Sequence, residues 1–184
     1  MSLKSGIFVI AEIKGPAAKR IRKIQKRFDP RLATEWPPHV TLAGSSGMGP
    51  IDAATPIDEL RSRLEQIARE TPPLLLAFGH PIRFMQTNIV VLPLNPHGPL
   101  RALHERIKSG GLRYDRARFY FTPHVTLSFY PEHSPAKLRE LLALRVPEPA
   151  DIEAIQVYHT RQDKASNKLF ELRLTGDVQP AAVG

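Results

Sequence analysis

Apolar positions along this chain recur with two periods, one typical of strands and one typical of helices. Residues 6–13, 39–43, 88–94 and 123–130 are rich in β-branched or aromatic residues and predict strands. Residues 74–84, 152–160 and 169–174 are expected to be extended as well. In four other segments apolar residues recur every three or four positions, which predicts helices with one buried stripe each. The stripes are Ile21, Ile24 and Phe28; Ile57, Leu60, Leu64 and Ile67; Leu100, Leu103 and Ile107; and Leu138, Leu141 and Leu142.

Prolines, glycines and hydroxyl residues predict where the helices begin and end. Gly15 and Pro16 open the first helix, and Gly110 with Gly111 ends the third. Thr55 and Ser134 each precede a proline and are predicted N-caps. Three segments are expected to be irregular: residues 30–38, the glycine-rich loop at 44–50, and the polar connection at 161–168.

The order of elements repeats, and so does a pentapeptide. The sequence PHVTL occurs at residues 38–42 and again at 123–127. Each copy follows the first strand of its half by about the same distance, and the halves are residues 6–84 and 88–174. We therefore predict an α+β fold with two pseudo-symmetric lobes, each with a mostly antiparallel sheet and helices, and a central groove between them. One bilobal domain is expected over residues 4–176, with a loose C-terminal tail at 177–184.

Composition narrows the class of protein. The chain has 184 residues, a net charge of +8 and no cysteine. Without cysteine, a disulfide scaffold, a thiol nucleophile and cysteine-bound zinc are excluded. No apolar run approaches the ~20 residues that a membrane span needs, so we expect a cytoplasmic protein without a membrane role. The positive charge favours a partner rich in phosphate.

The repeated pentapeptide carries the candidate chemistry. Because side chains alternate along a strand, His39 and Thr41 share one face, as do His124 and Thr126. Val40, Leu42, Val125 and Leu127 then face the core. Two imidazoles near neutral pH can act as base and acid in phosphodiester cleavage, and the two hydroxyls can bind phosphate oxygens. Which histidine is the base and which the acid stays open.

Two H-x-T motifs 85 positions apart (124 minus 39) in a basic chain of this size resemble the 2H phosphoesterases, in particular the 2′-5′ RNA ligase-like or RNA 2′,3′-cyclic phosphodiesterase branch. The resemblance covers about residues 6–174. It implies a bilobal fold and a metal-independent hydrolase that opens 2′,3′-cyclic phosphates on RNA ends or nucleotides, with reversible RNA ligation as a further activity. It assigns His39, Thr41, His124 and Thr126 to the catalytic site.

Other residues are candidates for substrate binding. In a regular strand, Ser128 and Tyr130 share the face of His124, and Tyr130 could stack on a base. The aromatic run at 119–121 is expected to pack in the core and in the adjoining loop. A basic cluster could guide RNA or simply face solvent; it comprises Lys19, Arg20, Arg22, Lys23, Lys26, Arg27 and Arg31. Arg113, Arg116 and Arg118 form a second such group.

Several ligands and partners are not expected. The remaining histidines lack metal-binding spacing, so neither a metal nor another cofactor is predicted. No protein partner is implied, and we expect a monomer. Two alternatives stay open: a non-catalytic RNA-binding module on the same scaffold, and an enzyme for a small cyclic phosphate derived from ADP-ribose. The first is motivated by the charge and by Ser128-Phe129, which stand where many RNA-ligase-like members carry a basic residue.

Overall fold

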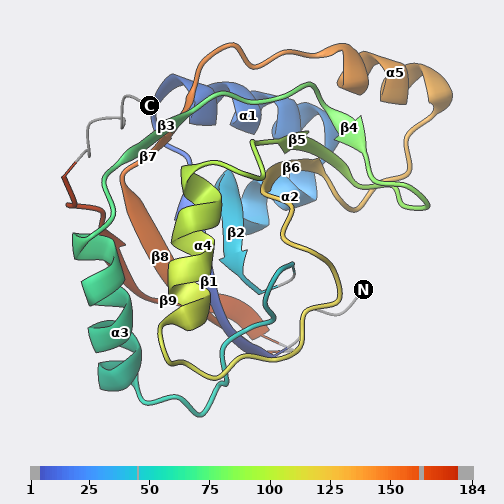
Figure 1. The fold of residues 1–184 in the computed structure, drawn as a ribbon. Helices are drawn as coiled ribbons and strands as arrows, with labels where there is room; N and C mark the ends of the chain where they lie inside the picture. The colour runs from blue at the N-terminus through green and yellow to red at the C-terminus, as the bar shows by residue number, and fades with distance from the viewer. Residues whose placement is uncertain (1–4, 45, 162–163, 178–184) are drawn as a thin grey trace.

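The structure is a computed structural model that describes residues 5–44, 46–161 and 164–177. Both halves of the chain contain strands and helices (Figure 1). The strands are β1 (Gly6–Glu12), β2 (His39–Ala43), β3 (Leu74–Leu76), β4 (Ile82–Arg83), β5 (Val90–Pro93), β6 (His124–Ser128), β7 (Ala150–Ile152), β8 (Ala154–Arg161) and β9 (Lys164–Arg173). The helices are α1 (Gly15–Phe28), α2 (Pro30–Glu35), α3 (Ile57–Arg69), α4 (Pro99–Ser109) and α5 (Pro135–Ala143).

One seven-stranded antiparallel sheet organises the molecule, in the order β4-β5-β6-β2-β1-β8-β9. A second, two-stranded sheet pairs β3 with β7. The α+β class with mostly antiparallel strands is therefore confirmed. The sequence predicts a separate sheet in each lobe. In the structure, strands of both halves instead form the one seven-stranded sheet, because β2 and β6 are hydrogen-bonded neighbours.

The two halves of the chain exchange elements. Helix α1, from the first half, packs against β6, and α4, from the second half, packs against β2. Strands near the end of each half also pair with a strand of the other half. In this way β4 pairs with β5, and β8 pairs with β1. Each half is thus completed by elements of the other, and β2 and β6 are the strands through which the two halves pair in the middle of the sheet.

Alternation along β2 and β6 places the core. Both strands have the same burial pattern, in which Val40, Leu42, Val125 and Leu127 are fully buried. The helices pack on them with the predicted stripes, for example Ile21 and Phe28 of α1. Burying these apolar side chains on one face leaves the opposite face for the polar residues of both strands.

Some local expectations are wrong at element ends. The segment at 30–38 is not wholly irregular: α2 begins at Pro30, and the Asp29 side chain caps it by accepting from the backbone N–H of Leu32 at 3.0 Å. Thr55 does not cap α3, whose N-cap is Pro56, and Ile57 is exposed. Ser134 does cap α5, as predicted.

Two other segments also differ from the sequence prediction. The polar connection belongs in part to the long strand β9, which begins at Lys164. Of the aromatic run at 119–121 only Phe121 packs in the interior, whereas Phe119 and Tyr120 are exposed. The predicted C-terminal tail lies outside the described residues except for Asp177.

Candidate active site

The two H-x-T motifs meet at the β2–β6 seam. Val40 pairs with Val125, and antiparallel pairing then sets His39 across from Thr126 and Thr41 across from His124. All four side chains are half-buried on the face opposite the core. In this register the two histidines occupy diagonal positions, which typically lie ~7–8 Å apart. One small oxyanion between the two strands could therefore contact both imidazoles and both hydroxyls.

Each histidine is oriented in the same way by its own backbone. His39 Nδ1 donates to the carbonyl of Pro37 at 2.7 Å, and His124 Nδ1 donates to the carbonyl of Thr122 at 2.6 Å. A carbonyl oxygen can only accept, so the proton sits on Nδ1 in both rings. The Nε2 atom of each ring is thereby left to take up or deliver a proton.

The surroundings of both rings favour the neutral imidazole. Burial lowers the pKa of His124 below its ordinary value, with the Thr122 carbonyl as a smaller opposing influence. Burial likewise lowers the pKa of His39, and the nearby charge of His124 lowers it further. The Pro37 carbonyl and, more weakly, Glu12 act in the opposite direction on His39. The two rings therefore interact electrostatically across the seam.

Aromatic rings lie against both histidines. The Trp36 ring is 5.5 Å from the His39 ring and 5.1 Å from that of Tyr158. On the other side, Phe84 stands edge-on to His124 at 5.0 Å. The sequence gives no signal for Phe84 or Tyr158, because they come from strands or turns far along the chain. These rings provide flat apolar surfaces beside the polar groups.

Ser128 and Tyr130 do not join the four motif residues. The register shifts opposite residues 126–128, so Leu127 and Ser128 both turn inward and Ser128 is fully buried. Its hydroxyl lies 2.8 Å from His133 Nε2. Tyr130 donates to Glu35 at 2.5 Å, and Arg31 lies over its ring at 3.9 Å. The expectation that both share the face of His124 holds only for a regular strand, and the bulge removes that condition.

Three buried polar residues hold the motif strands in place, a role that no sequence motif indicates for them. Gln25 of α1 donates to the carbonyl of Thr126 at 2.8 Å. His104 of α4 lies 2.8 Å, through Nδ1, from the carbonyl of Leu42. Asp29 accepts from the N–H groups of Phe129 and Tyr130 at 2.7 and 2.9 Å. Gln25 could have been noticed, since it lies four positions after Ile21 on a buried stripe.

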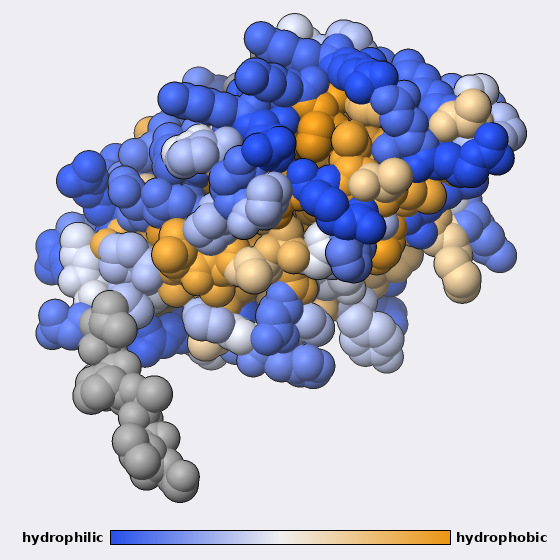
Figure 2. Space-filling view, turned by 90° about the horizontal axis from the view of Figure 1, so that it is seen from above, coloured by the Kyte–Doolittle hydropathy of each residue, from blue (hydrophilic) through white to orange (hydrophobic). Residues whose placement is uncertain are grey.

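Three arginines of the basic cluster on α1 and α2 are paired with glutamates. Arg20 pairs with Glu148 at 2.5 Å, Arg27 pairs with Glu140, and Arg31 pairs with Glu35 at 2.8 Å. Arg22 instead donates to the carbonyls of Ala33 and Trp36. Figure 2, which views the molecule from the side of α1 and α5, shows mostly hydrophilic residues with hydrophobic ones visible between them. This distribution favours the interpretation of α1 as a helix with a solvent-facing polar side.

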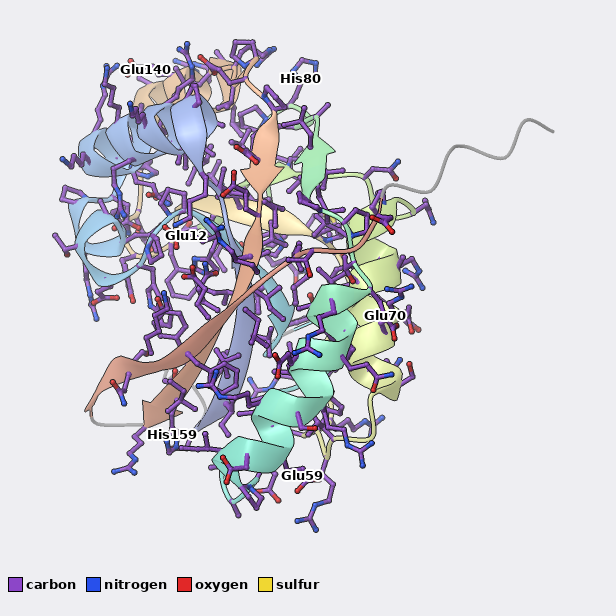
Figure 3. The ribbon with its side chains drawn as sticks, turned by 90° about the vertical axis from the view of Figure 1, so that its left-hand side faces the viewer. Glu12, Glu59, Glu70, His80, Glu140 and His159 are labelled. Carbon is purple, nitrogen blue, oxygen red and sulfur yellow. The ribbon has the colours of Figure 1, made fainter. Side chains whose placement is uncertain are left out.

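The other histidines and the acidic residues are dispersed. His80 and His159 lie at opposite ends of the molecule, and Glu12 lies near its middle (Figure 3). Within the described ranges, no three His, Asp or Glu residues are grouped so that they could hold a metal ion. In the same ranges, no helix combines the length and apolar character of a membrane span.

Comparison with known proteins places these features in a family. The family model described as the 2′-5′ RNA ligase superfamily matches residues 13–164. A protein of Geobacillus kaustophilus named "Putative phosphoesterase" is 35% identical over 105 residues, which cover 56% of this chain and 57% of the relative. A protein of the same name from Geobacillus thermodenitrificans is 34% identical over a match of the same extent. The match thus spans little more than half the length of these relatives.

Solved structures share the fold at low identity. Escherichia coli LigT complexed with 3′-AMP has a TM-score of 0.57 and 16% identity, with 93% of this chain and 98% of LigT covered. TT0787 of Thermus thermophilus has a TM-score of 0.61 and 18% identity, with coverage of 94% and 99%. With the paired motifs at one seam and the family match over most of its length, this chain belongs to the 2′-5′ RNA ligase superfamily of 2H phosphoesterases.

Proposed function

We propose that this protein is a metal-independent cyclic phosphodiesterase that opens 2′,3′-cyclic phosphates at RNA ends or on nucleotides. The main support is the seam between β2 and β6, where two imidazoles with the same tautomer lie on one sheet face. Each ring presents Nε2, and each is accompanied by a threonine across the seam. Neighbours of the same fold carry nucleotides, such as LigT with 3′-AMP and with ATP.

The proposed reaction needs only these groups and water. The neutral imidazole removes a proton from water through Nε2 as the water oxygen attacks phosphorus. The P–O bond to the ribose 3′ oxygen breaks, and the protonated imidazole gives its Nε2 proton to that oxygen. The product is a 2′-phosphate with a free 3′ hydroxyl, which the family resemblance favours. Thr41 and Thr126 donate hydrogen bonds to the non-bridging oxygens as charge builds on them.

Turnover of a defined panel tests this proposal. The panel holds 2′,3′-cyclic nucleotides, an RNA with a cyclic-phosphate end and 2′-5′-linked dinucleotides, each assayed with and without EDTA. We expect hydrolysis of cyclic phosphates that EDTA leaves unchanged. His39→Ala and His124→Ala should each lower kcat by about 10²- to 10⁴-fold, the usual contribution of a general acid or base. Loss of activity in EDTA would contradict the metal-independent mechanism.

The same variants separate enzyme from binding module. If the parent protein turns over no member of the panel and RNA affinity survives in both histidine variants, the protein is an RNA-binding module. Cleavage of a cyclic phosphate derived from ADP-ribose that greatly exceeds cleavage of RNA ends would indicate a small-nucleotide enzyme instead. Cleavage of the RNA end with loss in both variants supports the proposal as stated.

A further inference from the structure

Two aromatic rings stand in solvent a few residues before the second motif. Tyr120 is 94% exposed and Phe119 is 65% exposed, whereas the next residue, Phe121, is 7% exposed and stacks on His104 at 3.8 Å. Scattered exposed apolar residues are common, but two adjacent large rings beside a candidate active site are a candidate contact surface. We call residues 116–120 the arginine–aromatic segment; it contributes Arg116, Arg118, Phe119 and Tyr120.

The segment has a fixed course, although its rings are exposed. Figure 1 shows the chain running along the edge of the molecule from the end of α4 to β6. On the way, Gly47 donates its backbone N–H to the carbonyl of Phe119 at 2.8 Å, and Gly49 donates to that of Asp115 at 3.0 Å. The glycine-rich loop after β2 thus holds this segment. A surface held in this way loses less conformational entropy when it binds a ligand than a free loop would.

The segment is also connected directly to the candidate catalytic residue. The Thr122 hydroxyl donates to the carbonyl of Tyr120 at 3.3 Å, and the carbonyl of Thr122 accepts from His124 Nδ1. Tyr120 precedes His124 by four residues, a stretch that spans at most about 14 Å. On another side of the same imidazole stands Phe84, followed by Met85, which is also exposed. A chain leaving the His124 side of the site could therefore reach the exposed rings.

Ion pairing distinguishes the arginines of this segment from three arginines of α1 and α2. Arg116 and Arg118 are exposed, and neither forms an ion pair with a described residue. By contrast, Arg20 and Arg27 on α1 and Arg31 on α2 are each paired with a glutamate. Arginines without ion-pair partners can neutralise backbone phosphates, and exposed rings can stack on bases without sequence preference. This combination is typical of surfaces that bind single-stranded nucleic acid.

We infer that the arginine–aromatic segment binds the nucleotides that precede the terminal cyclic phosphate of a single-stranded RNA. The inference rests on the proposed function, since it assumes that the cyclic end lies between His39 and His124. Phe119 and Tyr120 stack on bases upstream of that end, and Arg116 and Arg118 contact their phosphates. The protein is accordingly specific for the end of an RNA strand over a free cyclic nucleotide.

Substrates of increasing length test the inference. We compare kcat/KM for a 2′,3′-cyclic mononucleotide with that for oligonucleotides of two, three and six residues ending in the same cyclic phosphate. In the parent protein kcat/KM should rise about five- to hundredfold with length, as expected when one stacked base is gained. Phe119→Ala with Tyr120→Ala should abolish most of this rise and leave the mononucleotide rate within about twofold. Ile57→Ala, which removes another exposed apolar side chain, on α3, is the matched control and should behave as the parent.

A second readout addresses the arginines. Arg116→Ala and Arg118→Ala should each weaken oligonucleotide binding and reduce the slope of log affinity against log salt by about 1. The mononucleotide rate again serves as the check that each variant is folded.

The results of these experiments distinguish a failure of the inference from a failure of the proposed function. Turnover of the mononucleotide with no rise with length, or with a rise that survives in the double variant, overturns the inference and leaves the proposed function intact. If no cyclic phosphate is turned over, the proposed function fails. Fluorescence anisotropy of a labelled hexanucleotide with a 3′-phosphate then decides the remaining question. Weaker binding in the double variant supports the arginine–aromatic segment as an RNA-binding surface. Unchanged binding overturns the inference and indicates that the exposed rings contact a protein partner instead.

Discussion

At the scale of single residues, the two candidate catalytic histidines are equivalent by geometry. Each is oriented by the backbone carbonyl two positions earlier in the sequence, that of Pro37 for His39 and that of Thr122 for His124. That interaction is local, so it is repeated wherever the pentapeptide takes the same extended form. It fixes the tautomer before any substrate binds. Only the environment distinguishes the rings, and burial lowers the pKa of both.

These lowered pKa values predict the pH dependence of activity. The productive form has one neutral and one protonated imidazole. The value of kcat/KM should therefore follow a bell-shaped pH profile, which is set by the pKa values of the two imidazoles in the free protein. A lowered pKa means that a ring gives up its proton at a lower pH than 6.5, the ordinary value. The doubly neutral, inactive form therefore accumulates already near neutrality. We expect the maximum of kcat/KM for a 2′,3′-cyclic nucleotide to lie below about pH 6.5.

The profile of kcat alone should lie at higher pH than that of kcat/KM. A bound phosphate anion stabilises the imidazolium and raises its pKa in the complex. Rates at limiting and saturating substrate between pH 5 and 9 measure both profiles. A kcat/KM maximum at pH 7.5 or above would show that the rings are not desolvated in the free protein.

At the scale of elements, the junction of α1 and α2 supports the strand of the second motif. Asp29 is almost completely buried and accepts three backbone hydrogen bonds, from Leu32, Phe129 and Tyr130. It therefore caps α2 and ends β6 at the same time. Because strand and helix come from different halves, this carboxylate couples the order of the second motif to the first half of the chain.

Removal of this carboxylate should destabilise the whole protein. Asp29→Ala leaves three N–H groups without their acceptor, and we expect the free energy of unfolding to fall by about 3 kcal/mol. Glu148→Ala is the control, because that carboxylate is exposed to a greater extent and pairs at the surface with Arg20; its loss should reduce the free energy of unfolding much less than the loss of Asp29. Urea denaturation of both variants gives the comparison. Equal losses would mean that the buried acceptor has no special role.

At the scale of the whole molecule, His104 joins three parts of the structure that are distant in sequence. It is fully buried in α4, lies within hydrogen-bond distance of the carbonyl of Leu42 in β2, and stacks on Phe121. Above it passes the glycine-rich loop: a Cβ at Gly47, whose φ is +74°, would lie only 2.3 Å from His104 Nε2. Nε2 has no hydrogen-bond partner among the described residues. A proton added to Nε2 would therefore lack a hydrogen-bond acceptor, and the charged imidazole would be unfavourable.

This arrangement predicts sensitivity to acid. Burial lowers the pKa of His104, with the carbonyl of Leu42 as a smaller opposing influence. Below pH 6.5 the unfolded chain consequently binds more protons at this site than the folded protein, and stability falls as pH falls. His104→Asn, which can still donate to Leu42, should lose less stability between pH 7.5 and 5.0 than the parent does. Urea midpoints at both pH values measure the difference.

The exposed His97 provides a control for this prediction, because His97→Asn should leave the acid sensitivity as it is in the parent. His39 and His124 contribute with the same sign in all three proteins and cancel in the comparison. If His104→Asn lost stability on acidification as steeply as the parent, the protonation of His104 would not be what destabilises the fold.

The sequence by itself determined the local features of this protein. Apolar periodicity located the helices and most strands, since a strand or helix must bury one face wherever it packs. The alternation in PHVTL assigned Val40 and Leu42 to the core and left His39 and Thr41 on the other face. The repetition of that pentapeptide indicated the family, which the match over residues 13–164 confirms. The elements and the alternation depend on neighbours within a few positions, and the repeat can be read directly from the sequence.

Only the tertiary structure decided how the two halves meet. Direct pairing of β2 with β6, the exchange of α1 and α4, and the approach of Phe84 to His124 depend on contacts between distant segments. No local period encodes such contacts. The bulge that turns Ser128 inward belongs to the same class, because it arises from the register with β5. The chain therefore specifies its chemical groups locally, whereas long-range packing brings them to one seam.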